Sequence, residues 1–195
     1  MKPLWTTKKN LVYLYRGAPP SLPELPEGFE CHVITPRILD QYFSEDADRA
    51  RAGQYRAFLD QGARGYVVTS GDRWAAAAWL APSEAKGAPH HIPASVSSKF
   101  PWTYHAHTHP DFRRRGLHNY LVARRVADAA QGTQSAVATD IAPANSPSRA
   151  SYMALGFEPA GTLTVRTLRI PYLKPRIVGR WRKHTHHPPL ETGQS

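Results

Sequence analysis

A run of three arginines followed by a glycine, Arg113–Gly116, has the residue types that bind anions. The apolar residues of Leu117–Ala130 recur at helical spacing, so a helix is expected to begin directly after the glycine. Its start carries no Ser, Thr, Asp or Asn cap, so its first backbone N–H groups need another partner. A phosphate suits them, because helix N-termini attract anions, and Gly116 lets a ligand approach without a Cβ in the way. The segment predicts a pyrophosphate-binding turn; from these residues alone, a solvated basic turn is the alternative.

A second segment, Asn145–Phe157, begins 29 residues after Gly116 and has the residue types of a short helix. Ser146 is expected to cap this helix, with Pro147 at its first position. Tyr152 then falls about two turns along the helix, and Gly156 is expected to end it. A phenol in that place could donate a proton to a leaving group, and a packed core tyrosine is the alternative.

Taken in order and at this spacing, the two segments resemble the cofactor-binding region of the GCN5-related N-acetyltransferases (GNATs), which are acyl-CoA-dependent enzymes. The resemblance implies acetyl-CoA as co-substrate, Asn145 as a contact of the pantetheine arm and Tyr152 as the general acid. The cofactor-binding residues that it implies are Thr108, Arg113, Arg114, Arg115, Gly116, Leu117, His118, Asn145 and Ser148. His118 departs from the family pattern, which usually has glycine or alanine there, so the seating of the cofactor beside it is left open.

Acetyl transfer to an amine also requires a base, because a primary amine with a pKa of about 10.4 is protonated at pH 7. The candidates lie on the predicted strand Trp102–Thr108 and on the next strand; they are Tyr104, His105, His107 and Asp140. In a regular strand Tyr104 shares the face of Thr108, and the two histidines lie on the other face. A bulge would reverse this assignment, so the base is left open. Backbone N–H groups of the same strand could stabilise the oxyanion.

Three alternate histidines, His105, His107 and His109, also allow a zinc-site hypothesis. On a regular strand they would share one face, and imidazole is a good zinc ligand. Further ligands could come from His90–His91 or from the tail histidines, which are His184, His186 and His187. Because Pro110 interrupts the strand and the acetyltransferase chemistry needs no metal, no metal is expected.

The remaining pattern predicts one α/β (α+β) domain over residues 29–182. The predicted strands are Glu30–Thr35, Gly65–Ser70, Trp74–Ala81, Trp102–Thr108, Ser135–Ile141, Thr162–Ile170 and Arg176–Trp181. The predicted helices are Pro36–Phe43, Asp46–Gln61, Leu117–Ala130 and the helix after Asn145. Arg124, Arg125 and Asp128 are placed on the polar face of the third helix. The family resemblance implies the order β-α-α-β-β-β-α-β-α-β-β, in a mixed sheet that is splayed at its centre and flanked by helices.

The regions outside this domain are expected to be less regular. Residues 1–28 are an N-terminal extension, with an edge strand at Leu11–Tyr15 and a Pro-rich linker at Ala18–Gly28. Residues 183–195 are a flexible basic and polar tail. The N-terminus lacks a secretory apolar core, and no apolar run reaches about 18 residues. Cys31 is the single cysteine, so an internal disulfide is excluded and a cytoplasmic location is expected, with no membrane partner.

The formal net charge of +10 favours polyanionic partners, of which coenzyme A is one. The leading hypothesis is acetylation of a small-molecule amine. A macromolecular acceptor, either a protein lysine or aminoacyl-tRNA, is the second hypothesis, and a non-catalytic module that binds acyl-CoA or nucleic acid is the third. Residues 83–101 form a long connection that is expected to border the acceptor pocket. Acyl chain length and oligomeric state, with a homodimer allowed, are left open.

Overall fold

The computed structural model describes residues 4–83, 85, 92, 94–131, 136–168 and 176–183. Its strands are β1 (Trp5–Tyr15), β2 (Glu30–Val33), β3 (Arg64–Ser70), β4 (Arg73–Ala81), β5 (Trp102–Thr108), β6 (Val137–Ile141), β7 (Glu158–Leu168) and β8 (Arg176–Arg182). Its helices are α1 (Pro36–Tyr42), α2 (Arg49–Asp60), α3 (Ala94–Ser97), α4 (Leu117–Ala129) and α5 (Ser146–Ala154), with 3₁₀ turns η1 (Asp46–Asp48) and η2 (Pro110–Phe112). After β1, the element order is the predicted one with the single-turn α3 added, and the predicted fold class is confirmed.

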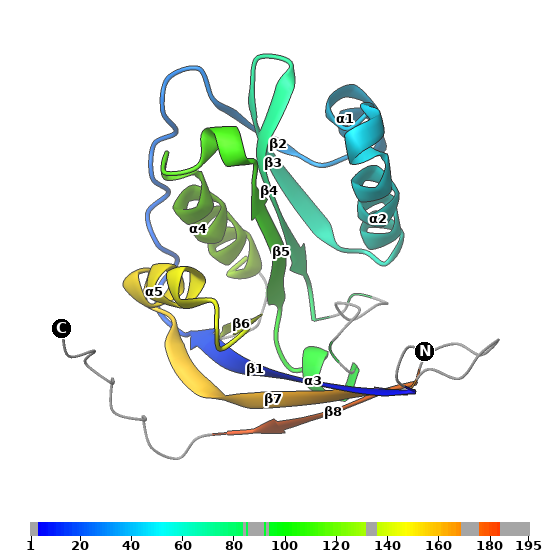
Figure 1. Cartoon of the computed structure of the whole chain (residues 1–195). Coiled ribbons are helices and arrows are strands. Elements are labelled where there is room, and N and C mark those ends of the chain that lie inside the picture. The colour runs from blue at the N-terminus through cyan, green and yellow to red at the C-terminus, as the bar shows by residue number, and fades with distance from the viewer. Residues whose placement is uncertain are drawn as a thin grey trace.

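The strands form one eight-stranded sheet in the order β2-β3-β4-β5-β6-β1-β7-β8 (Figure 1). Only β5 and β6 are parallel neighbours, and their pairing consists of Trp102 with Ala138 and Thr103 with Thr139. Beyond these pairs the two strands separate, so the sheet is splayed at its centre as predicted. Figure 1 shows α1 and α2 on one side of the first four strands of the sheet and α4 on the other.

β1 is the main departure from the predicted fold. The edge position predicted for Leu11–Tyr15 is wrong, because β1 pairs antiparallel with β6 on one side and with β7 on the other. Val12, Tyr13 and Leu14 are consecutive and at most 2% exposed, so both faces of the strand are covered. A continuous apolar run is typical of such an interior strand, whereas an edge strand with one wet face shows alternation.

The sheet separates two differently built core layers. The α1–α2 side is aromatic, with Phe43, Tyr55, Phe58, Trp79 and Trp102 buried in one cluster. On the α4 side, the strand surface is made of small residues: Ala75, Ala76 and Ala78 of β4 are completely buried there. Ala76 and Ala78 pack against Leu117 and Leu121, so α4 lies close to the sheet. Gly71–Asp72 form the β3–β4 turn as predicted.

The tail prediction can be followed only as far as Lys183, because residues 184–195 lie outside the described ranges. Within those ranges, no helix combines the length and the apolar composition needed to cross a membrane. Residues 16–29, which include the predicted linker Ala18–Gly28, form neither helix nor strand.

The interior position of β1 gives a stability prediction. Replacing Leu14 with alanine should lower the free energy of unfolding by about 2–5 kcal/mol, because the cavity would lie inside a two-sided core. Lys9→Ala, on the exposed part of the same strand, should change it by no more than about 0.5 kcal/mol. Urea unfolding measures both. Equal, small effects would show that β1 does not belong to the folded core.

Candidate functional site: an anion cleft joined to a chamber in the split sheet

The N-terminus of α4 opens into a cleft of about 750 Å³. Gly116 is the N-cap residue, with a left-handed φ of +74°, and no side chain caps the helix. A Cβ at Gly116 would meet nothing within 4 Å, so the positive φ, rather than a crowded neighbour, is what favours glycine here. The nine residues implied in cofactor binding all line this cleft; they are Thr108, Arg113, Arg114, Arg115, Gly116, Leu117, His118, Asn145 and Ser148. The uncapped start of α4 and three arginine residues therefore line one cavity, which suits a diphosphate.

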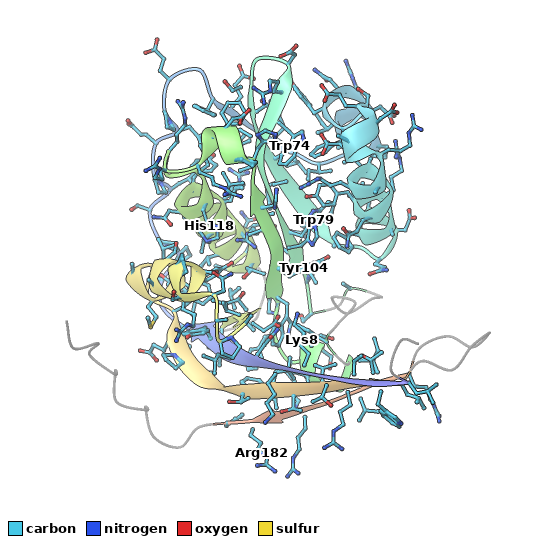
Figure 2. The ribbon with its side chains drawn as sticks, viewed as in Figure 1. Lys8, Trp74, Trp79, Tyr104, His118 and Arg182 are labelled. Carbon is cyan, nitrogen blue, oxygen red and sulfur yellow. The ribbon has the colours of Figure 1, made fainter. Side chains whose placement is uncertain are left out.

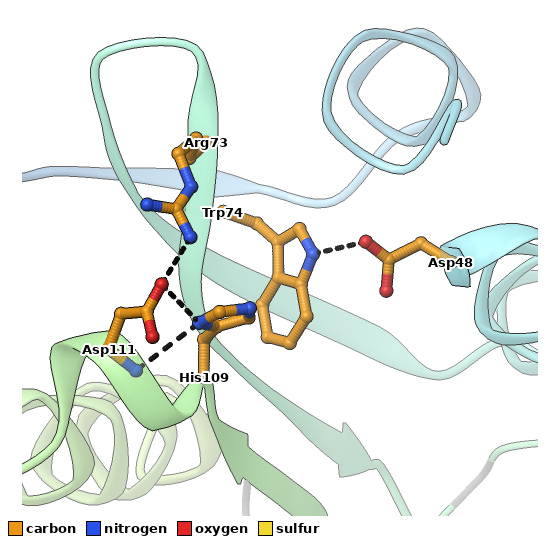
Figure 3. Close-up of polar contacts among 5 residues, drawn as sticks. All are labelled: Asp48, Arg73, Trp74, His109 and Asp111. Carbon is orange, nitrogen blue, oxygen red and sulfur yellow. Dashed lines mark hydrogen bonds and ion pairs between the residues drawn. The ribbon is translucent and has the colours of Figure 1, made fainter. Parts of the chain in front are cut away.

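A polar network fixes the turn that precedes the arginine run (Figure 3). Arg73 Nη2 donates to Asp111 Oδ2 at 2.6 Å, and the Asp111 backbone N–H donates to His109 Nδ1 at 3.4 Å. The His109 ring packs edge-on against Trp74, with ring centroids 5.2 Å apart. Trp74 Nε1 in turn donates to Asp48 at 2.7 Å. The β3–β4 hairpin and the start of α2 thus hold the beginning of the anion loop.

A second cavity of about 230 Å³ lies where β5 and β6 separate, and we call it the chamber. Its walls are Lys8, Asn10, Tyr104, His105, Ala106, His118, Thr139, Asp140, Ile141, Ala142, Asn145, Ser148 and Tyr152. Ala106, His118, Asn145 and Ser148 also line the cleft, so the two cavities adjoin. A ligand bound by phosphate in the cleft could therefore extend an arm into the chamber.

Asn145, not Ser146, caps α5, so the predicted cap is wrong by one residue. Asn145 Oδ1 accepts from the Ser148 N–H at 3.3 Å, and Ser146 and Pro147 form the first helical positions. The amide side chain suits this place, because Asn is among the strongest N-cap residues and proline has no N–H to satisfy. With Oδ1 used by the cap, a contact of Asn145 with a ligand carbonyl would come from Nδ2.

The other end of α5 fixes Tyr152. Gly156 has φ +89°, and the Phe157 N–H donates to the Tyr152 carbonyl at 3.0 Å in a Schellman-type cap. The Tyr152 ring is 3% exposed and packs edge-on against Phe157 at 4.9 Å and His118 at 5.6 Å. Its Oη accepts a hydrogen bond from Arg125 Nη2 at 3.1 Å.

Arg125 was predicted on the polar face of its helix, and that prediction is wrong: its side chain is completely buried. The sequence held a signal for this. Val122 and Ala129 are buried, and Arg125 lies on the same helical stripe, three residues after the first and four before the second. A charged residue on an apolar stripe indicates a buried polar contact.

A bulge in β5 changes the expected directions of the base candidates. His105 has φ +50°, and the pairing with β4 shifts register between Ala77 and Trp79. Tyr104 and His105 consequently both pack against Phe58, at 5.2 and 5.4 Å between ring centroids. His107 packs against Trp74, a member of the same core cluster, at 5.6 Å. The regular-strand assignment, which placed the two histidines opposite Tyr104, is therefore wrong.

The four candidates differ in place and in chemistry. Tyr104, His105 and Asp140 line the chamber with Tyr152, whereas His107 lines the anion cleft. Burial raises the pKa of Tyr104, so it gives up its proton reluctantly. Burial, followed by the charges of Arg51 and Arg113, lowers the pKa of His107, so this imidazole is neutral at pH 7. Asp140 accepts a hydrogen bond from Asn10 Nδ2. The choice of base stays a prediction.

Two residues that line the chamber, Lys8 and Asn10, were not among the site residues predicted from the sequence. Both come from the part of β1 that precedes Leu11–Tyr15, the segment predicted as an edge strand. In Figure 2, the side chain of Lys8 lies on the side of β1 that faces Tyr104. Only the place of β1 between β6 and β7 brings these side chains to the chamber.

His118 lies at the junction of the cleft and the chamber. Burial, with a smaller contribution from the Arg125 charge, lowers the pKa of His118 to about 4. Its Nε2 atom is buried and has no hydrogen-bond partner among the residues that the structure describes. The imidazole is therefore neutral at pH 7, and His118 lines both cavities.

The zinc hypothesis finds no support from geometry. His105, His107 and His109 contact Tyr55 or Trp74 rather than one another. Among the described residues, no group of three or more His, Cys, Asp or Glu side chains could hold a metal ion. His90–His91 and the tail histidines, which were considered as further ligands, lie outside those residues.

Two comparisons with known proteins concern the sequence of this chain. The FR47-like protein family model matches residues 99–167, from just before β5 to β7. No curated protein matches the sequence significantly.

Solved structures have a similar fold at low sequence identity. A GNAT-family protein from Novosphingobium aromaticivorans has a TM-score of 0.56 at 20% identity over 83% of this chain and 66% of its own. A GCN5-related N-acetyltransferase-like protein from Streptococcus suis has a TM-score of 0.58 at 16% identity over 86% and 64%. A tandem GNAT protein from the clavulanic acid biosynthesis pathway has a TM-score of 0.58 at 20% identity over 78% and 50%. This chain thus spans half to two thirds of each solved chain.

The burial of His118 gives a pH prediction. Its folded pKa of about 4 lies below the ordinary 6.5, so between these values the unfolded chain binds a proton that the folded chain does not. The free energy of unfolding should therefore fall as the pH drops from about 6.5 towards 4. His118→Gln should remove this part of the slope. Urea unfolding at several pH values and an NMR titration of the imidazole measure it; titration near 6.5 would contradict the burial.

Proposed function

We propose, on the premise that this chain has the GCN5-related N-acetyltransferase fold, that it transfers the acetyl group of acetyl-CoA to the primary amine of a small molecule. The observation that carries the proposal is the junction of two cavities. The uncapped start of α4 and the arginines before it line the cleft, and Tyr152 lines the chamber. His118 and Asn145 line both cavities. This is the arrangement that a thioester on a diphosphate-bearing carrier requires.

The cleft would hold the diphosphate of the cofactor. The left-handed Gly116 directs the first amides of α4 towards the ligand, and Arg113–Arg115 supply charge. The Nδ2 group of Asn145 is suited to a carbonyl of the pantetheine arm. The bound cofactor supplies an acyl carbon joined to a thiol leaving group.

Transfer then proceeds by direct attack within a ternary complex. The amine nitrogen forms a bond to the thioester carbon, and its excess proton passes to a base, for which His105 and Asp140 line the chamber. Backbone N–H groups of β5 beyond Thr103, where pairing with β6 has ended, are suited to the oxyanion. The C–S bond breaks, and the Tyr152 hydroxyl gives its proton to the departing thiolate.

A small polar acceptor fits the chamber. Its volume of about 230 Å³ is modest, and Lys8, Asn10 and Asp140 form a polar wall on the side of β1 and β6. A carboxylate such as Asp140 attracts an ammonium group, and the Lys8 ammonium attracts an anionic group. An amine that carries a second polar group matches these walls better than a purely aliphatic one.

A macromolecular acceptor is the second candidate, and one surface favours it. The alternation of β1, β7 and β8 directs five cations to the face opposite the chamber; they are Lys9, Arg166, Arg176, Arg180 and Arg182. Figure 2 shows Arg182 pointing away from the body of the molecule. Over Trp5–Leu11, Thr162–Leu168 and Arg176–Arg182, the same alternation brings no carboxylate to that face, which would suit a polyanion such as RNA.

An acceptor screen with acetyl-CoA tests the proposal. Amines, amino acids, peptides and aminoacyl-tRNA are compared by thiol release, and turnover on small amines is expected. Tyr152→Phe should lower kcat by about 10²–10⁴-fold, because the leaving thiolate loses its proton donor, with little change in KM for acetyl-CoA. Tyr120→Phe, which removes a hydroxyl from α4 at a residue that lines neither cavity, is the matched control.

The screen also separates the alternatives. Turnover restricted to peptides or tRNA would establish the macromolecular acceptor. Binding of coenzyme A without turnover on any acceptor would establish a non-catalytic module, and absence of binding would overturn the proposal. An acyl-CoA with a longer chain, used in parallel, reports the acyl preference.

Gly116 provides a test of the cofactor cleft alone. Gly116→Ala places a Cβ on a residue with φ +74°, at a cost of roughly 1–2 kcal/mol, and on the side from which the diphosphate would approach. KM for acetyl-CoA should rise about tenfold, equivalent to about 1.4 kcal/mol. Gly53→Ala, within helix α2 and with nothing within 4 Å of its added Cβ, should leave KM unchanged. Equal KM values for the two variants would place the cofactor elsewhere.

A further inference from the structure

Arg125 is a buried cation without a carboxylate partner. Its side chain is completely buried, and no ion pair within the described part of the chain includes it. Its hydrogen bonds go instead to neutral oxygens. Nε donates to the Leu121 carbonyl at 3.0 Å, and Nη1 donates to the carbonyls of Trp79 at 3.2 Å and Tyr104 at 3.4 Å. Burial of an uncompensated charge is unfavourable, so its presence calls for a role.

The fourth contact leads to the reaction. Nη2 donates to Tyr152 Oη at 3.1 Å. A guanidinium group has donors only, so the phenol oxygen must be the acceptor in this bond. The hydroxyl hydrogen of Tyr152 is then left for a different acceptor, and Tyr152 lines the chamber in which the proposed thioester sulfur would lie. The contact thus favours the orientation in which the Tyr152 hydroxyl can donate its proton towards the chamber.

The same contact stabilises what remains after proton transfer. When Tyr152 gives up its proton, the oxygen becomes negative while it is 3.1 Å from a cationic donor. In a buried place of low dielectric this attraction is stronger than in water, and the donor is already positioned. The negatively charged partner that Arg125 lacks in the resting protein would therefore form during the reaction, as the Tyr152 phenolate.

Arg125 also connects the acid to the acyl-binding strand. The Tyr104 carbonyl that accepts from Nη1 directly precedes the bulged His105, and the Trp79 carbonyl belongs to the adjacent β4. One side chain therefore sets the phenol of α5 against the strand whose N–H groups are suited to the oxyanion. Such positions matter, because small displacements of reacting groups lower rates strongly.

We propose that Arg125 is a positioning residue for acetyl transfer: its guanidinium group orients the Tyr152 hydroxyl towards the leaving sulfur and stabilises the phenolate that forms. This inference rests on the proposed function and on Tyr152 as the acid.

A double-mutant cycle on kcat tests it. Arg125→Lys keeps the charge and loses the forked donors, and Arg125→Met keeps the length and loses the charge. Either should lower kcat about tenfold or more, with Met the more severe, and leave KM for acetyl-CoA within about twofold, because the loss affects the acid rather than binding. In the Tyr152→Phe background, the same changes should alter kcat by less than about twofold. Arg124→Lys, the neighbouring residue whose guanidinium lies over Tyr66 at 5.5 Å, is the control.

The outcomes are distinguishable. If the Arg125 effect persists in full when Tyr152 is phenylalanine, Arg125 is structural and the inference is wrong, while the proposed function stands. If Tyr152→Phe leaves kcat unchanged, the acid assignment itself fails. The Lys and Met variants differ in their effects on folding, and thermal unfolding shows which of them is folded.

A second measurement needs no turnover. Arg125→Met should raise the His118 pKa from about 4, since the Arg125 charge contributes to lowering it. An unchanged pKa would place the Arg125 cation elsewhere.

Discussion

The early end of pairing between β5 and β6 is the constraint on which the site depends. Parallel strands normally continue to exchange hydrogen bonds, and here the exchange stops after Thr103 and Thr139. The backbone groups of this edge beyond that point need other partners, and the chamber lies between the two strands there. The bulge at His105 and the buried Arg125 both act at this opening. A ligand that completes the missing hydrogen bonds would in effect bridge the two halves of the sheet.

The two halves are held together by β1. With β6 on one side and β7 on the other, β1 closes the second half of the sheet, and it carries Lys8 and Asn10 to the chamber. The N-terminal segment therefore contributes both to folding and to the walls that an acceptor would meet. One strand serves both, because Lys8 and Asn10 line the chamber and Val12–Leu14 lie in the core.

Local signals and the family resemblance together predicted the lining of the cleft. The uncapped helix, the arginines and the glycine are all short-range features, and the nine residues that the resemblance implies line one cavity. The errors came from features that sequence spacing does not fix. One residue of bulge reversed the faces of His105 and His107, and strand β1 found its neighbours through contacts more than a hundred residues away. Arg125 is the exception. Its position on the buried stripe of the helix follows from sequence spacing, but its charge led to the prediction that it lies on the polar face.

The alanine surface of β4 has a consequence for how such sites vary. Only the methyl groups of Ala76 and Ala78 separate helix α4 from the sheet at this place. Tyr152 belongs to a different helix, α5. A bulkier side chain on this strand would lift the N-terminal end of α4, and it would also disturb Tyr152, because His118 and Arg125 of α4 contact its ring and its hydroxyl. Sequences that keep the motif residues and enlarge this layer would thus shift the anion cleft relative to the sheet. The thickness of an apolar layer, rather than a polar contact, would then set how the cleft and the chamber join.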